Sequence, residues 1–233
     1  MGDANRQVIL VARPTGIAQA ADFAIRPGPI DQPGPGQILV RNHYLSVEPA
    51  MRGWIADRGN YAAPVPIGSV MRALAAGQVV ASGDAAYQIG DHVAGWFGWQ
   101  DYACVSIDQV VQRTSAAEMR ASLGILGING VTAYLALTMI GQPRAGETVL
   151  VSTAAGAVGS AVGQIARILG CRTIGIAGGP DKARRCVEHF GYDSAIDYRG
   201  EDVGSAVAQI APEGIDIYFD NVAGAISDAV LSH

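Results

Sequence analysis

A glycine-rich turn is the segment of this sequence whose residue types and spacing most directly indicate chemistry. The pattern Ala154-x-Gly156-x-x-Gly159 stands between an apolar β-rich run and an apolar helical run. Gly156 would let the backbone approach a diphosphate, and Gly159 would let the helix pack close to the strand. The start of the helix adds unpaired N–H groups and a partial positive charge. The turn therefore predicts a dinucleotide pyrophosphate site formed by Gly156, Ala157, Val158 and Gly159.

The choice of dinucleotide depends on the end of the next predicted strand, Thr173 to Ala177. An NAD enzyme needs a carboxylate there for the ribose 2′-hydroxyl, but the strand ends without an acid. Lys182 follows it, together with two arginines at 184 and 185, so a 2′-phosphate would meet cations. This pattern favours NADP(H). Asp181 is the counter-argument, although the first turn of a helix is also a structural place for an acid, and the two arginines also fit a solvated helix face.

The elements that would position these residues alternate between strand and helix after about residue 145. Such repeated units imply a parallel sheet with right-handed crossovers and a doubly wound α/β fold. The predicted strands are Thr148 to Ser152, Thr173 to Ala177, Ser194 to Tyr198 and Ile215 to Asp220, and the predicted helices are Val158 to Leu169, Asp181 to Phe190 and Asp202 to Ile210.

The first third of the chain has a different pattern, of short strands separated by glycine and proline turns, and it predicts a small, irregular β-barrel. Ser115, with Glu118 three residues later, fits a capping box and predicts a helix start. We place the domain boundary so that residues 1–122 form one domain and residues 123–233 the other. The predicted strands of the barrel are Gln7 to Val11, Gln37 to Leu45, Val79 to Ala81, His92 to Trp96, Tyr102 to Ser106 and Gln109 to Gln112.

Composition and charge restrict the class of partner. A net charge of −5 gives no basic field for a phosphate backbone, so nucleic acid and anionic membranes are disfavoured and small molecules favoured. Three widely spaced cysteines suit a reducing compartment, and the N-terminus lacks a secretory signal pattern, so we expect a cytoplasmic protein. We read each cysteine as a small buried hydrophobe. Ala121 to Pro143 is uncharged, but its glycines favour a buried helix over a membrane span.

These segments together resemble the zinc-independent alkene and enone reductases of the medium-chain dehydrogenase/reductase superfamily. The group includes prostaglandin reductase, curcumin reductase and plant alkenal double-bond reductase, and the similarity covers nearly the whole chain. The similar runs are Tyr44 to Gly53, Pro66 to Arg72, Gly127 to Tyr134, Gly146 to Val149, Ala154 to Ser160, Gly163 to Ala166, Gly175 to Gly179 and Asp220 to Val222.

The resemblance implies an N-terminal GroES-like β-barrel domain, a Rossmann domain and a specific reaction. NADPH would deliver a hydride to the β-carbon of an α,β-unsaturated carbonyl compound, an enone or alkenal. It also implies that Lys182 and Tyr198, beside Gly178, approach the 2′-phosphate and that Thr132 and Asn221 lie at the nicotinamide half. The alternatives stay open: Thr132 could bond within its helix, Tyr198 could only end a strand, and Asn221 could only shape a turn.

The metal and the substrate pocket follow from the same resemblance. Related alcohol dehydrogenases use four close thiolates for a structural zinc, and place a cysteine near the position of Val47 and a histidine near that of Ser69 for a catalytic zinc. Neither set is present, so we predict no metal. Tyr61 and Met71 are candidate pocket residues. Tyr61 could equally be an aromatic residue of a turn, and Met71 could equally be a methionine of the core. The family often has an aromatic at Ala50, which puts the substrate preference in doubt.

The chain stops at His233, where the family continues, and we therefore expect both domains to be incomplete. The tyrosine usually proposed to hydrogen-bond the enolate would lie beyond that point, so the catalytic residue is unknown. The resemblance also implies a homodimer. Two other functions remain: an NADPH-dependent quinone oxidoreductase, and an NADP-binding fragment without catalysis.

Overall fold

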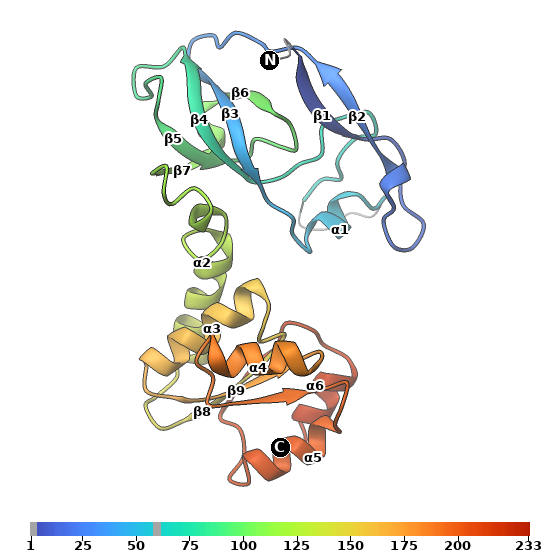
Figure 1. Cartoon of the computed structure of the whole chain (residues 1–233), viewed down its shortest axis with the longest axis vertical. Helices are drawn as coiled ribbons and strands as arrows, with labels where there is room; N and C mark the ends of the chain where they lie inside the picture. Colours follow the sequence, from blue (N-terminus) through green and yellow to red (C-terminus); the bar gives the residue numbers. More distant parts are fainter. Residues whose placement is uncertain (1–3, 58–61) are drawn as a thin grey trace. The chain divides into compact units, whose positions relative to one another are not determined.

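The computed structural model describes residues 4–57 and 62–233. The chain divides into two compact units, Met1–Leu123 and Gly124–His233 (Figure 1). The first unit consists mainly of antiparallel strands. β1 and β2 form a hairpin, and the other strands form a five-stranded sheet in the order β6-β3-β4-β5-β7. The bounds are β1 Asn5–Leu10, β2 Phe23–Gly28, β3 Gln37–Leu45, β4 Ala75–Ser82, β5 His92–Gly95, β6 Tyr102–Ser106 and β7 Val110–Thr114.

The five-stranded sheet is stabilised by a cluster on one face, to which alternate residues such as Ile38 and Val40 of β3 contribute. Its buried cluster includes Ile38, Val40, Val79, Val93 and Val105. A second cluster of this unit, with Leu10 and Met71, packs under the short helix α1, Met51–Trp54. The 3-10 turns η1 Ala20–Asp22, η2 Ile107–Gln109 and η3 Ala121–Leu123 complete the unit.

Two features of this unit differ from the sequence-based expectation. β2 includes Pro27 and Gly28, although proline and glycine were expected to separate the strands, because an edge strand tolerates proline. The helix expected to begin at Ser115 is instead a run of turns before η3. Ser115 Oγ does contact Glu118, accepting from its N–H at 3.3 Å and donating to its Oε2 at 2.7 Å. The Ser115 hydroxyl thus holds the Glu118 side chain without starting a helix. The prediction that a helix begins at Ser115 was wrong.

The second unit is a parallel four-stranded sheet in the order β10-β9-β8-β11. This order, with the first strand in the middle and a switch between β8 and β11, confirms the doubly wound α/β prediction. The strands are β8 Thr148–Ser152, β9 Arg172–Ala177, β10 Ser194–Asp197 and β11 Ile217–Phe219, and the helices are α2 Ile128–Leu135, a π-helix η4 Ala136–Gly141, α3 Ala157–Ile168, α4 Pro180–Glu188, α5 Val203–Ile210 and α6 Ala225–Val230.

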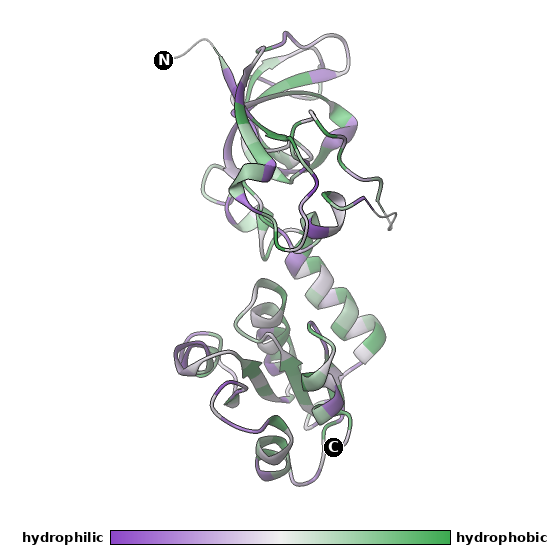
Figure 2. Cartoon of the chain, turned by 90° about the vertical axis from the view of Figure 1, so that its right-hand side faces the viewer, coloured by the Kyte–Doolittle hydropathy of each residue, from purple (hydrophilic) through white to green (hydrophobic). Residues whose placement is uncertain are grey.

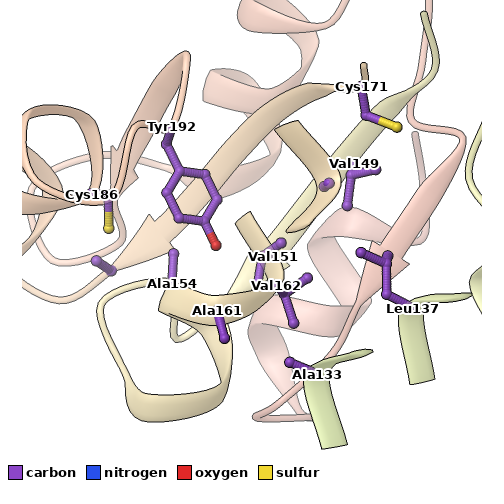
Figure 3. Close-up of a cluster of buried hydrophobic side chains, with 12 residues drawn as sticks. Ala133, Leu137, Val149, Val151, Ala154, Ala161, Val162, Cys171, Cys186 and Tyr192 are labelled. Carbon is purple, nitrogen blue, oxygen red and sulfur yellow. The ribbon is translucent and has the colours of Figure 1, made fainter. Parts of the chain in front are cut away.

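Both faces of this sheet are covered, which explains why β8 is buried along its whole length. One face packs on a cluster with Ala161, Val162 and Tyr192, which Figure 3 shows around β8. The other face packs on a cluster with Ile174, Val203 and Val207. The strands of this unit are correspondingly hydrophobic in Figure 2. Central parallel strands are buried on both sides in this way.

The segment between Ala121 and Pro143 was expected to be one buried helix. It is divided into several elements, and only part of its side chains are buried. It contains η3, α2 and η4, and only some of its side chains, such as Ala133 and Leu137, are buried. Tyr134, Met139 and Ile140 are exposed. The expectation of burial was wrong because the described residues cover one side of this segment only. Within residues 4–57 and 62–233, no helix has both the length and the hydrophobicity that a membrane span requires.

Candidate dinucleotide-binding site

The predicted glycine turn joins the end of β8 to the start of α3. Gly156 is the N-cap residue of α3, and its N–H donates to the Thr153 carbonyl oxygen at 2.8 Å. Thr153 has a positive φ of 53°, which is unusual for a β-branched residue and marks a tightly constrained turn. A Cβ on Gly159 would lie 2.3 Å from the Thr153 carbonyl oxygen. Only glycine therefore lets α3 pass this close to the end of β8.

The N-terminus of α3 carries no group that would compete with a bound anion. No side chain caps Gly156, and the first turn of the helix has no acidic residue. The N–H groups of Ala157 and Val158 belong to the first turn, where a helix offers no carbonyl partner of its own. Free N–H groups and the positive end of the helix dipole favour a diphosphate here.

The ends of β9 and β10 lie side by side and bring Gly178 and Tyr198 together. A Cβ on Gly178 would lie 2.6 Å from the Tyr198 hydroxyl oxygen, so the phenol lies directly against the glycine backbone. The Asp197 carboxylate joins the same two loops, since its Oδ1 accepts from the Gly179 N–H at 2.6 Å and from the Arg199 N–H at 3.0 Å. These bonds hold the two loops in one fixed arrangement.

The cations of α4 differ in their partners. Arg184 forms ion pairs with Asp181 at 2.7 Å and with Glu188 at 3.8 Å, as expected for a solvated helix face. The guanidinium of Arg185 lies over the ring of Phe190, 5.9 Å from its centroid. Lys182 is exposed in the first turn of the helix and takes part in no ion pair among the described residues.

A further cation at this end was missed by the sequence analysis. Arg199 is exposed, and its guanidinium carbon lies 5.9 Å from the centroid of the Tyr198 ring. The signal in the sequence was a basic residue directly after the tyrosine that ends the third parallel strand. Sequence distance hid it, because Arg199 is far from the 182–185 cluster along the chain.

The residues predicted for the nicotinamide half lie on two different elements. Thr132 is exposed on α2, and Asn221 is exposed just after β11. Asn221 is fixed to the last residue of β8: its N–H donates to Ser152 Oγ at 2.7 Å, and its Nδ2 donates to the Ser152 carbonyl oxygen at 2.9 Å. Asn221 therefore lies next to the strand end from which the glycine turn starts.

Asp220 belongs to the Asp220 to Val222 run that resembles the family, and it accepts more hydrogen bonds than any other side chain of this region. Its donors are Ser152 Oγ at 3.0 Å, Tyr218 Oη at 3.0 Å, Ser227 Oγ at 2.6 Å, and the N–H groups of Val222 at 2.9 Å and Ala223 at 3.1 Å. Partial burial acts to raise the pKa of this carboxyl, but the bonds from Ser227 and the two N–H groups outweigh it. The pKa of Asp220 is held well below its usual range.

A cavity of about 650 Å³ lies within the first unit and includes Met71 in its lining. Trp54, Trp96 and Phe97 supply aromatic walls, and Cys104 lines it as well. Cys104 is partly exposed, which corrects the reading of all three cysteines as buried, whereas Cys171 and Cys186 are buried. Tyr61, the other predicted pocket residue, lies outside the described residues.

Comparison with known families places both units in oxidoreductases. Residues 6–112 match a family described as the N-terminal domain of oxidoreductase, and residues 157–233 match a family described as zinc-binding dehydrogenase. The chain is 43% identical over 228 residues to the NADPH-dependent curcumin reductase of Escherichia coli, covering 97% of this chain and 66% of that protein. It is 38% identical to the NADP-dependent 2-alkenal reductase of Nicotiana tabacum, over 97% of this chain and 68% of that protein.

Among solved structures, CurA from Vibrio vulnificus in complex with NADPH superposes with a TM-score of 0.91 at 41% identity. The match covers 97% of this chain and 68% of that one. The chain belongs to the medium-chain dehydrogenase/reductase superfamily, in the group of NADP-dependent curcumin, alkenal and prostaglandin reductases. It spans about two thirds of the length of these relatives.

The description of the second family raises the question of a zinc ion. Among residues 4–57 and 62–233, no three side chains of His, Cys, Asp or Glu lie together in a way that could hold a metal. Val47 and Ser69 occupy the two positions that the resemblance associates with ligands of a catalytic zinc ion. Neither side chain is a typical zinc ligand. The donor set of the described residues does not fit zinc.

Proposed function

We propose that this chain binds NADP(H) and belongs to an enzyme that reduces the C=C bond of α,β-unsaturated carbonyl compounds, enones or alkenals. The proposal is supported by the similarity to the NADPH-dependent curcumin reductase and the NADP-dependent 2-alkenal reductase. It is also supported by the similarity to a solved structure that contains NADPH. The single observation that carries it in this chain is the uncapped, acid-free start of α3 behind the tight Thr153 to Gly156 turn.

Each part of the cofactor has candidate partners in the second unit. The N–H groups of Ala157 and Val158, with Gly156 and Gly159, would hold the pyrophosphate. Lys182 and Tyr198, with Gly178 between the two loops, would hold the 2′-phosphate, since a compact ammonium and a phenol hydroxyl both suit phosphate oxygens. A carboxylate at the tip of β9 would repel that phosphate, and the strand has none.

The nicotinamide half would be held by Thr132 and Asn221. Because the Nδ2 group of Asn221 is used by β8, its side-chain oxygen is the atom available to accept from an amide or a ribose hydroxyl. When bound, NADPH supplies a hydride for the β-carbon of the substrate. The residues described here orient that cofactor.

The substrate would occupy the first unit, in the cavity lined by Met71, Trp54 and Trp96. Its aromatic and methionine walls suit a conjugated, largely apolar compound. We accordingly assign residues 1–122 to the substrate domain and residues 123–233 to the NADP-binding domain. We further propose that the reaction is zinc-independent, since the available donors do not fit the ion.

Location and assembly complete the proposal. All three cysteines are free, which suits the reducing cytoplasm. A homodimer is expected from the resemblance, and sedimentation of the purified protein would test it.

Two measurements test the proposed function in order. Titration of the chain with NADPH and with NADH should show tighter binding of NADPH, and no binding of either nucleotide would overturn the proposal. Addition of an enone or alkenal should then lower the absorbance of NADPH as the cofactor is oxidised. A quinone is tested in parallel as the alternative substrate. Faster turnover of the quinone would favour the quinone oxidoreductase alternative, and tight binding without hydride transfer would favour a binding role alone.

A further inference from the structure

Two carboxylates bracket the parallel pair formed by β8 and β11. Asp216, just before β11, accepts from the N–H of Thr148, the first residue of β8, at 2.8 Å. Asp220, just after β11, accepts from the hydroxyl of Ser152, the last residue of β8, at 3.0 Å. Both therefore tie the same two strands, but only Asp220 does so at the end where the glycine turn begins.

Ser152 links Asp220 to Asn221. The buried Ser152 hydroxyl donates its one proton to Asp220 and accepts from the Asn221 N–H at 2.7 Å. Because a carboxylate only accepts, it fixes the direction of the serine proton and so leaves an oxygen lone pair for the asparagine N–H. An uncharged amide at position 220 could donate as well as accept, and it would no longer impose this direction.

The same carboxylate shapes the loop that follows. Its bonds from the Val222 and Ala223 N–H groups hold a turn in which Ala223 has a positive φ of 61°. The bond from Ser227, in α6, attaches that turn to the next helix. Charge-assisted bonds of this kind are stronger than neutral ones. Asn221 lies inside this network and is itself exposed.

We propose that Asp220 is a positioning residue for cofactor binding, which holds Asn221 in one orientation against β8 for the nicotinamide half of NADP(H). This inference rests on the proposed function, because it assumes that NADP(H) is the ligand. Asp220 acts through Asn221 and Ser152, and its own oxygens are used by the protein. Its effect is therefore confined to the nicotinamide half and absent from the adenosine half.

The test compares two ligands on the purified chain by calorimetric titration. NADPH contains both halves, whereas adenosine 2′,5′-bisphosphate contains only the adenosine half with its 2′-phosphate. In Asp220→Asn, NADPH affinity should fall by about tenfold, the effect of losing one charge-assisted bond. The affinity for the bisphosphate should stay within about twofold of the original, a difference too small to represent a lost bond. Asp216→Asn is the matched control, and it should leave both affinities unchanged.

Two further variants show whether Asp220 acts through Asn221. Ser152→Ala removes the linking hydroxyl and should reproduce the selective loss, which keeps the test available if Asp220→Asn fails to fold. Asn221→Ala should lower NADPH affinity, and the double variant Asp220→Asn/Asn221→Ala should lose little more than the larger single loss. Additive losses, an equal loss for both ligands, or the same loss in Asp216→Asn would overturn the inference. Failure of the original chain to bind either ligand would instead overturn the proposed function.

Discussion

The hydroxyl of Tyr192 donates to the carbonyl oxygen of Gly159 at 2.6 Å. Tyr192 precedes β10 and is almost completely buried in the cluster drawn in Figure 3. Its ring fills the space next to Gly163 in α3 and Gly175 in β9. The Tyr192 side chain thus connects the segment before β10 with the first turns of α3. The position of the proposed pyrophosphate site depends on packing far from it in sequence.

Tyr192→Phe should lower the free energy of unfolding by about 1 kcal/mol, the usual net contribution of one hydrogen bond. The ring would stay in place, and the Gly159 carbonyl would keep its partner within the helix, so no larger loss is expected. Urea unfolding followed by circular dichroism measures the change. A destabilisation of the size found when a buried aromatic is truncated, about 3 kcal/mol or more, would show that the hydroxyl does more than donate this one bond.

Gly159→Ala should destabilise the second unit and weaken NADPH binding, because the new methyl group would lie 2.3 Å from a backbone oxygen that cannot move freely. Overpacking of this kind costs about 1–3 kcal/mol. Gly204→Ala, in α5, is the matched control, since its nearest neighbour would be 3.6 Å away. That substitution should leave NADPH affinity unchanged and stabilise the helix by up to about 1 kcal/mol. Thermal unfolding and NADPH titration of both variants test the pair, and equal behaviour would contradict the close-packing argument.

The second unit was predictable in detail because its signals are local. The continuous β-rich run at β8 and the helical run after Gly156 place the turn within one residue, and the parallel sheet follows from the βα alternation. The N-terminal sheet was predictable only in part. β2 has an exposed, proline-containing pattern, and its strand character comes from pairing with β1, which no local pattern indicates.

The site was harder to predict than the fold for the same physical reason. The roles of Asp220 and Arg199 depend on neighbours brought together by the sheet: Ser152 is 68 residues from Asp220 along the chain. The exposure of Tyr134 and Ile140 was likewise hidden, since an apolar run does not show which of its sides the chain covers. The solvated helix face considered for Arg184, by contrast, agrees with its ion pair to Asp181, because partners three residues apart on a helix are local.

Lys182→Ala should lower the affinity for NADPH by about tenfold or more, as expected when a charged phosphate contact is lost, and should change the affinity for NADH little. Only NADPH carries the 2′-phosphate that the ammonium would contact. Arg184→Ala is the control on the same helix, because this arginine is already paired with Asp181, and it should affect both nucleotides slightly and equally. Parallel fluorescence titrations measure the four affinities. Equal losses of NADPH and NADH in Lys182→Ala would refute the assignment of this residue.

The three thiols should react with a disulfide reagent at different rates. Burial raises the pKa of the Cys186 thiol to about 11, so at pH 8 only about one molecule in a thousand carries the reactive thiolate. Cys171 is buried as well, whereas Cys104 is partly exposed, although burial raises its pKa too. We expect the Cys104 thiol to react first in the native chain, and all three thiols to react in denaturant. Cys104→Ser should remove the first phase, and rapid reaction of Cys186 in the native state would contradict its burial.

The stabilising effect of Asp220 should depend on pH in one direction. Its pKa is lower in the folded chain than the ordinary value of about 3.9 for an unfolded aspartate, so the folded state favours the ionised form. The stabilisation is then complete above about pH 5 and decreases as acid protonates the unfolded chain and finally the folded one. Urea unfolding of the original chain and Asp220→Asn between neutral and acidic pH should therefore show a stability difference that is constant near neutrality and shrinks below about pH 4. A difference that grew on acidification would mean that this carboxyl is held in its protonated form.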